Sequence, residues 1–177
     1  MAEYYLISQL PALDGLGDHD PVPITQERFM ELCGRFLKKP VLEELEKMTL
    51  IPEAEPVASC SRVLEAWNLG ERDLRLALGK ARADKLGKTF DLQGVALAGE
   101  VQKTAATAVE MTNPLEAERF LWEYRLRFLE LLRPIEPFSQ DFVFYYGLKL
   151  KLLARIRQFD AAVGESVYKN IYNTILG

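Results

Sequence analysis

Histidine and cysteine are nearly missing from this chain, and their scarcity limits the chemistry available to it. The 177 residues include one His and two Cys. A single His excludes any site with two histidine ligands, including the repeated Glu-x-x-His pattern of di-metal carboxylate bundles. Two thiols cannot form a four-thiolate zinc site. We therefore expect no cofactor and no metal site.

The motifs of common enzyme families are also missing. The chain has no GxxxxGK[ST] phosphate loop, no GxGxxG after a strand and no GxSxG nucleophile elbow. The lone His19 stands between Asp18 and Asp20 in a turn-rich segment, where a solvated acidic loop is favoured over a metal site. The sequence predicts a protein that is not an enzyme and has no catalytic residues. An enzyme with an unrecognised pocket stays open as an alternative.

Long apolar runs and an export signal are lacking too. No window approaches 18 apolar residues, so no membrane span is predicted. The first residues are too few and too polar for a signal peptide. We interpret Cys33 and Cys60 as reduced thiols, each a small core hydrophobe. These features predict a cytoplasmic protein.

The remaining composition is that of a folded domain with an uneven charge. Hydrophobic residues make up 49% of the chain and charged residues 27%, and the net charge is -4. An acidic chain is a poor default nucleic-acid binder. Residues 1–58 carry 11 acidic and 5 basic side chains, whereas residues 61–177 carry 15 and 17. This split indicates two faces with different neighbours, or chance unevenness.

Helical periodicity dominates from Thr25 onward and predicts an all-α fold. We expect a bundle of about six to eight helices after a short irregular N-terminal lead-in. Residues 1–177 are expected to form one domain, with a candidate subdomain boundary near 50–58, where prolines and glutamates gather. Helix starts are predicted at the capping or first-turn residues Thr25, Pro40, Ser59 or Ser61, Asn113 with Pro114, and Ser139.

Several local features carry more detailed expectations. Residues 4–7 form a short apolar run, which predicts a strand or a buried extended segment. Gly70 is expected to break or kink its helix, and Gly87 to end it. The alanine-rich residues 91–111 predict a closely packed helix. A last short helix is expected around residues 167–175.

Two segments combine basic and aromatic or apolar residues in a way that favours contact with a partner. Residues 67–82 predict a cationic helix face that meets an acidic partner, although ordinary surface charge with internal pairing explains it too. Residues 142–157 predict a helix that is buried on most sides or docks on a partner. The candidate partner-binding residues are Trp67, Arg72, Arg75, Arg82, Tyr145, Lys149 and Arg155.

Three segments carry a family resemblance. Residues 4–11 (Tyr-Tyr-Leu-Ile-Ser-Gln-Leu-Pro), 67–86 and 142–155 resemble DUF2764, a bacterial family associated with V-type (A/V-type) ATPases. The tryptophan-led, arginine-rich residues 67–82 and the tyrosine- and lysine-bearing residues 145–155 are also similar to parts of the C (or d) subunit of rotary ATPases. The resemblance covers nearly the whole chain and rests on helical pattern and spacing.

The resemblance implies a function without catalysis in this chain. It implies a helical subunit or accessory protein of a bacterial V-type ATPase, a stalk-coupling component that takes part in ion or proton transport. Its partners would be stalk or rotor subunits, with no nucleic acid, and it would meet the inner face of the membrane only through the complex. The alternative is a free-standing helical module for protein–protein interaction or regulation.

Overall fold

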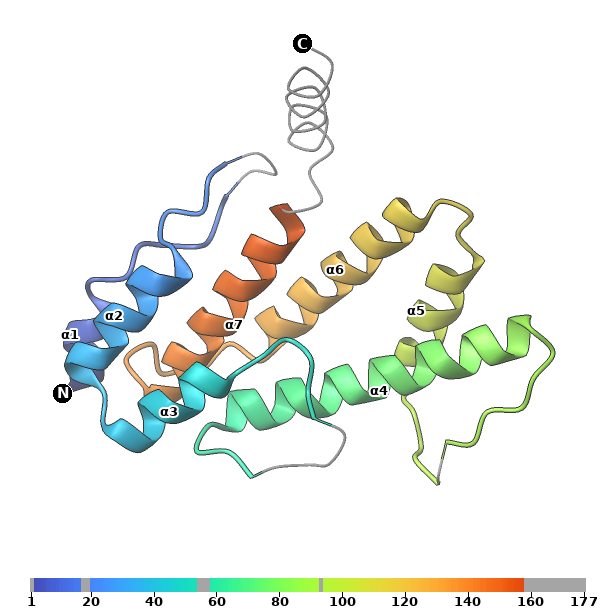
Figure 1. The fold of residues 1–177 in the computed structure, drawn as a ribbon, viewed down its shortest axis with the longest axis horizontal. Coiled ribbons are helices and arrows are strands. Elements are labelled where there is room, and N and C mark those ends of the chain that lie inside the picture. Colours follow the sequence, from blue (N-terminus) through green and yellow to red (C-terminus); the bar gives the residue numbers. More distant parts are fainter. Residues whose placement is uncertain (1, 17–19, 54–57, 93, 158–177) are drawn as a thin grey trace, which may run out of the picture.

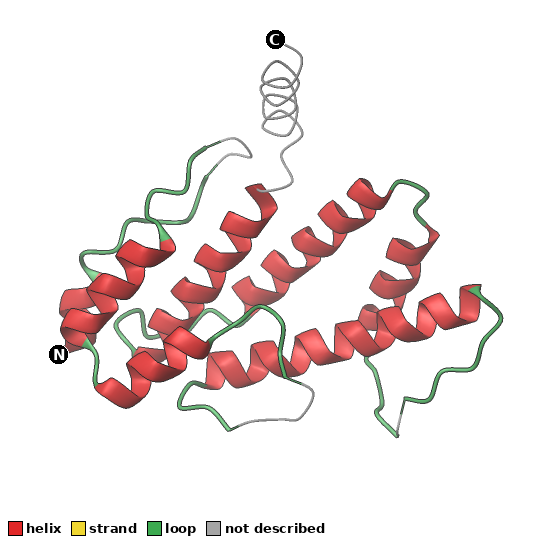
Figure 2. Cartoon of the chain, viewed as in Figure 1, coloured by secondary structure: helices red, strands yellow, loops and turns green. Residues whose placement is uncertain are grey.

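The regular elements of this protein are helices throughout the part of the chain that the structure describes. The computed structural model describes residues 2–16, 20–53, 58–92 and 94–157, and it places no strand among them (Figure 2). The prediction of an all-α bundle is confirmed. The described helices are α1 (Ala2–Ile7), α2 (Gln26–Phe36), α3 (Lys39–Lys47), α4 (Arg62–Lys85), α5 (Gly99–Glu110), α6 (Pro114–Leu131) and α7 (Gln140–Arg157). The helix expected around residues 167–175 lies outside the described residues.

Helices α2, α3, α4, α6 and α7 start at the capping or first-turn residues that the sequence predicts, whereas α1 and α5 do not. Thr25 Oγ1 accepts a hydrogen bond from the N–H of Arg28 at 3.2 Å. Asn113 Oδ1 accepts one from the N–H of Leu115 at 3.0 Å, and a proline lies in the first turn of α3 and of α6. These caps satisfy backbone N–H groups that have no partner inside the helix, and proline removes one such group.

The start of α4 is joined to the start of α7 by one carboxylate. Ser61 is fully buried, and its Oγ accepts from the N–H of Leu64 at 3.4 Å. The same hydroxyl donates to Asp141 Oδ1 at 2.7 Å, and that oxygen also accepts from the N–H of Arg62 at 3.0 Å. Of the two predicted caps, Ser61 is therefore the one used.

The helices form one layer of roughly parallel elements set across the long helix α4. In Figure 1, α2, α7 and α6 lie side by side with α7 in the middle, and α7 packs against both neighbours and against α4. Helix α5 packs against α4 and α6, and α1 and α3 pack against α2. The carboxyl-terminal half of α4 therefore extends beyond α7, with α5 as its main contact.

Two hydrophobic clusters hold this arrangement. The larger one surrounds α7 and is formed with residues of α1, α2, α3, the first turns of α4 and the end of α6. The smaller one lies between the second half of α4, α5 and the first half of α6, and includes the buried Leu74, Ala105 and Leu121. All residues of α7 from 143 to 150 are buried. Helix α7 is thus the centre of the fold, which explains its apolar composition.

Three local expectations were wrong. Residues 4–7 are helical, and burial there follows a helical turn, with Tyr4 and Tyr5 exposed and Leu6 buried. Helix α4 continues through Gly70 without the expected break, and the glycine leaves room for the ring of Phe128 from α6. Of the residues expected to begin the alanine-rich helix, 91, 92 and 94–98 lie outside α5 and in no helix.

The loop before α5 has a definite cause. Gly94 has a φ of 78°, a left-handed conformation that an α-helix cannot contain. The N–H of Val95 donates to the carbonyl of Leu92 at 2.9 Å, so a turn forms there. Gly87 also has a positive φ, 64°, and ends α4 as predicted.

Candidate functional site

The basic residues of α4 form a stripe on one side of the helix. Arg72, Arg75 and Arg82 occur with Gly79 and Leu86 at alternating spacings of three and four residues, so all five share one face. From position 72 to 82 the helix rises about 15 Å. We call Arg72, Arg75 and Arg82 the arginine stripe. The structure therefore brings together three of the predicted partner-binding residues.

Each arginine of the stripe has its own surroundings. The Nε of Arg72 donates to the carbonyl of Glu53 at 2.9 Å. The Nε of Arg75 donates to a carboxylate oxygen of Glu71 at 3.3 Å, and its side chain is 46% exposed. Arg82 is exposed and pairs with no carboxylate among the residues that the structure describes. The guanidinium groups of Arg75 and Arg82 are thus accessible for forked contacts with an anion.

An aromatic ring lies in the middle of the stripe. A Cβ atom added to Gly79 would lie 2.8 Å from Cζ of Phe90, so the ring rests directly on the glycine. Phe90 belongs to the loop after α4 and is 40% exposed. Arginine and aromatic side chains are enriched in protein–protein interfaces and in their energetic hot spots. The surface therefore has the composition of a contact site for a protein.

A buried ion pair fixes α4 to α6 behind the stripe. Glu71 is 3% exposed, and its two carboxylate oxygens accept from Nε and Nη2 of Arg125 at 2.8 and 2.7 Å. The guanidinium carbon of Arg125 also lies 4.8 Å from the ring centroid of Trp122. Two parallel charge-assisted hydrogen bonds fix both position and orientation. The helix turn that carries Arg72 and Arg75 is therefore held in one place.

The other predicted contact residues lie elsewhere. Trp67, Tyr145 and Lys149 are 0%, 2% and 7% exposed, so in this structure they belong to the interior and offer no surface to a partner. The physical reason is that both of their helices face the larger hydrophobic cluster. Arg155 is exposed and lies in the last turn of α7, at the end that points away from α4 (Figure 1).

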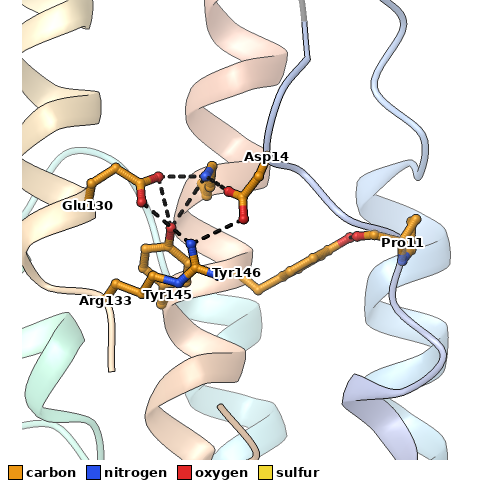
Figure 3. A network of polar contacts seen from close by, with 7 residues as sticks. Pro11, Asp14, Glu130, Arg133, Tyr145 and Tyr146 are labelled. Atoms are coloured by element: carbon orange, nitrogen blue, oxygen red, sulfur yellow. Dashed lines mark hydrogen bonds and ion pairs between the residues drawn. The ribbon is translucent and has the colours of Figure 1, made fainter. Parts of the chain in front are cut away.

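Lys149 is the buried centre of a partly exposed ionic cluster that joins three parts of the chain (Figure 3). Its Nζ donates to Asp14 of the N-terminal loop, to Glu130 of α6 at 2.5 Å and to the hydroxyl of Tyr145 at 3.3 Å. The Tyr145 hydroxyl donates to Glu130 at 2.8 Å, and Arg133 donates to Asp14 at 3.1 Å. The charges of Lys149, Asp14, Glu130 and Arg133 are therefore paired with one another.

The ion pairs and hydrogen bonds of the cluster shift the pKa values of its side chains. The hydrogen bond from Lys149 holds the pKa of Asp14 below its ordinary value of 3.8. Burial opposes the charge on Lys149, but its hydrogen bonds to Asp14 and Glu130 outweigh burial and raise its pKa. Burial and the hydrogen bond to Glu130 raise the pKa of Tyr145 to about 12. At neutral pH Asp14 and Lys149 are therefore charged and Tyr145 is neutral.

The sequence did not predict that Asp14 and Glu130 are the partners of Lys149. Asp14 lies 135 positions before Lys149 and Glu130 lies 19 before it. Lys149 itself stands in a stretch that is otherwise apolar or aromatic, and a buried lysine needs a carboxylate partner. That signal predicts that partners exist, but it does not say where in the chain they are.

Nucleophilic or metal chemistry finds little support in these side chains. Burial raises the pKa of the Cys33 thiol to about 12, and desolvation with the nearby Glu44 does the same for Cys60. Cys60 is exposed, which corrects its interpretation as a core hydrophobe. Among the residues that the structure describes, no three His, Cys, Asp or Glu side chains are placed to hold a metal ion.

Comparisons with known proteins neither support nor contradict the family resemblance of the sequence. No protein-family model, no curated protein and no solved structure matches the chain. None of the described helices has the length and apolar character needed to cross a membrane. The arginine stripe and the resemblance of its segment are therefore the two observations available for a functional hypothesis.

Proposed function

We propose that this protein is a non-catalytic helical subunit or accessory protein of a bacterial V-type ATPase. It contacts a stalk or rotor subunit through the arginine stripe of α4, and ATP hydrolysis belongs to other chains. In this role it is a cytoplasmic component that reaches the inner face of the membrane only through the complex.

One observation carries the proposal. The segment that resembles the rotary ATPase subunit, residues 67–82, is the segment that presents the arginine stripe on a long helix. A coupling component needs stiff helices and an exposed contact surface, and no catalytic groups. The buried Glu71–Arg125 pair supplies the stiffness, and Arg75 and Arg82 supply the contact. The same features serve a free-standing interaction module, so the identity of the partner is what the experiment must decide.

The test is co-purification of the tagged protein with ATPase subunits from its native cell. Replacing Arg72 and Arg75 by glutamate should reduce the recovery of ATPase subunits by about tenfold, the factor that 1.4 kcal/mol of binding energy produces. Opposite charges at an interface steer and orient partners, and their reversal creates repulsion. Quantitative mass spectrometry of the eluate measures the effect.

The matched control reverses two exposed carboxylates that lie outside the arginine stripe. Glu43 and Glu46 lie on α3, and their replacement by lysine changes the net charge by the same amount in the opposite sense. Recovery should stay within about twofold of the wild type, as for charges outside an interface. Equal losses in both variants would remove the argument from the stripe, and a wild-type eluate without ATPase subunits would refute the proposed function.

A further inference from the structure

A groove opens beside the arginine stripe, between the end of α4 and the start of α6. Its floor is formed by the buried side chains of Leu78, Ala108 and Leu121. Arg82 and Glu118 stand on opposite walls, on α4 and α6. The volume is about 430 Å³, within the range of about 300–1,000 Å³ that is usual for ligand pockets.

We propose that this groove binds an acidic peptide segment of a partner protein. An apolar side chain of that segment fills the floor, and carboxylates beside it pair with Arg82 and Arg75. The proposal rests on the proposed function, since it names the chemistry of the partner that the arginine stripe contacts.

The charges around the groove favour an acidic occupant. Arg82 has no carboxylate partner among the described residues, and Arg75 lies two turns before it on the same face. Lys85 adds a third cation, which donates to the carbonyl of Val109 at 2.6 Å at the end of α5. Glu118 is the one carboxylate among the residues that line the groove. A carboxylate of the occupant is therefore attracted to the α4 wall and repelled by the α6 wall.

The apolar floor indicates an apolar anchor next to those carboxylates. Leu86 is 69% exposed at the edge of the groove and continues the apolar surface out toward solvent. Water on such a surface is displaced favourably by an apolar side chain, which is the usual role of an anchor residue in a pocket. A purely acidic segment would leave this surface uncovered.

A second groove, on the other side of the α4–α5 contact, differs from the first in the arrangement of its charges. Its volume is about 540 Å³, and it is lined by Lys80, Lys85 and Lys103 together with Asp84 and Glu110. Carboxylates are interspersed among its cations, and it has no arginine. Both walls of this second groove carry cations and a carboxylate, whereas the α4 wall of the first groove carries cations alone, so the second groove offers a matched control surface within the same molecule.

The experiment uses the full-length protein and a defined probe. The probe is a fluorescein-labelled helical peptide of 16 residues, composed of leucine, glutamate and alanine, and the control peptide carries glutamine at every glutamate position. Fluorescence anisotropy measures binding, and methyl NMR of alanine-labelled protein locates it. We expect the acidic peptide to bind, with shifts at the methyl groups of Ala108 and Ala117 in the groove and none at Ala77 or Ala106 in the second groove.

Single substitutions should change the affinity for the acidic peptide in defined directions. Replacing Arg82 by glutamine should weaken binding about tenfold, which corresponds to 1.4 kcal/mol. Replacing Glu118 by glutamine should strengthen it several-fold, because the repelling carboxylate is removed. Replacing Lys103 by glutamine, which removes one cation from the second groove, should leave the affinity within about twofold. Circular dichroism and thermal unfolding confirm that each variant is folded.

Other outcomes overturn the proposal. Equal binding of the glutamine peptide, shifts confined to the second groove, or no binding at all would each contradict it. A further variant, Ala117→Trp, fills the groove without changing charge. If it keeps ATPase subunits bound while the reversal of Arg72 and Arg75 loses them, the groove proposal fails and the proposed function stands. If the peptide binds in the groove but no ATPase subunit co-purifies, the groove proposal stands and the proposed function fails.

Discussion

At the scale of single residues, glycines inside helices admit large side chains from neighbouring elements. Gly70 admits the ring of Phe128, and Gly79 admits that of Phe90. Gly147 lies in α7, where a Cβ atom would be 2.8 Å from Cε of Met48 and 3.2 Å from Cε1 of Phe29. These glycines weaken their helices intrinsically, and the packing they permit compensates for it.

We predict that Gly147→Ala destabilises the protein. Phe29 and Met48 are both buried, so neither can move aside freely. We expect an overpacking cost of about 1–3 kcal/mol. The gain in helix propensity, about 1 kcal/mol, is smaller. Urea unfolding followed by circular dichroism measures the net loss.

The matched control is Gly34→Ala in α2. A Cβ atom there meets only Cδ2 of Leu42, at the ordinary distance of 3.8 Å. This variant should be as stable as the wild type or up to about 1 kcal/mol more stable. A stabilised Gly147→Ala variant would show that the core around α7 accommodates an extra methyl group.

At the scale of elements, the contact between α4 and α6 depends on a charge that is buried with its partner. Glu71 receives two hydrogen bonds from Arg125 and one from Arg75. A buried carboxylate is tolerated only when such partners are present. The position of the arginine stripe thus depends on a residue of α6 that lies 54 positions away from Glu71.

We predict that Arg125→Met destabilises the protein by about 3 kcal/mol or more, because it leaves a buried charge with one weaker partner. The double variant Glu71→Leu with Arg125→Met should recover most of that loss, since it removes both charges together. A double-mutant cycle of unfolding free energies measures the coupling. Additive losses in the cycle would mean that the two residues do not act as a pair.

At the scale of the whole molecule, the ionic cluster around Lys149 joins segments that are distant in the chain. It connects the N-terminal loop through Asp14, α6 through Glu130, and the central helix α7. Tyr146 of α7 adds a hydrogen bond to the carbonyl of Pro11 at 2.8 Å in the same loop. The loop before α2 is therefore attached to the core at two points (Figure 3).

We predict that the contribution of Asp14 to stability disappears in acid. Its pKa is lowered in the folded state, so its contribution is complete above its ordinary pKa of 3.8 and is lost as pH falls through the folded value. Asp14→Asn should therefore be less stable than the wild type at pH 7, by about 0.5–1 kcal/mol because the half-exposed pair is screened by water. The difference should stay constant while pH falls toward 3.8 and should shrink as pH falls further. Unfolding free energies of both proteins above and below pH 3.8 provide the test, and a difference that stays constant below that pH would contradict it.

Local signals explain which parts of the structure were predictable. Caps such as Thr25 and Asn113, and the helical spacing of apolar residues, act within one or two turns, so they can be read directly from the chain. The arginine stripe follows from the same spacing. The burial of Trp67, Tyr145 and Lys149 could not be predicted, because an aromatic or basic residue looks the same in sequence whether its helix is central or peripheral.

The sequence by itself determined that this protein is helical, where α2, α3, α4, α6 and α7 begin, and that three arginines share one face of α4. These properties depend on neighbours within a few residues, through backbone geometry and capping. Only the tertiary structure decided that α7 is the centre of the core, that Asp14 and Glu130 neutralise Lys149, and that a groove lies beside Arg82. Burial, ion pairing and cavities are set by residues far apart in the chain, and packing alone brings those residues together.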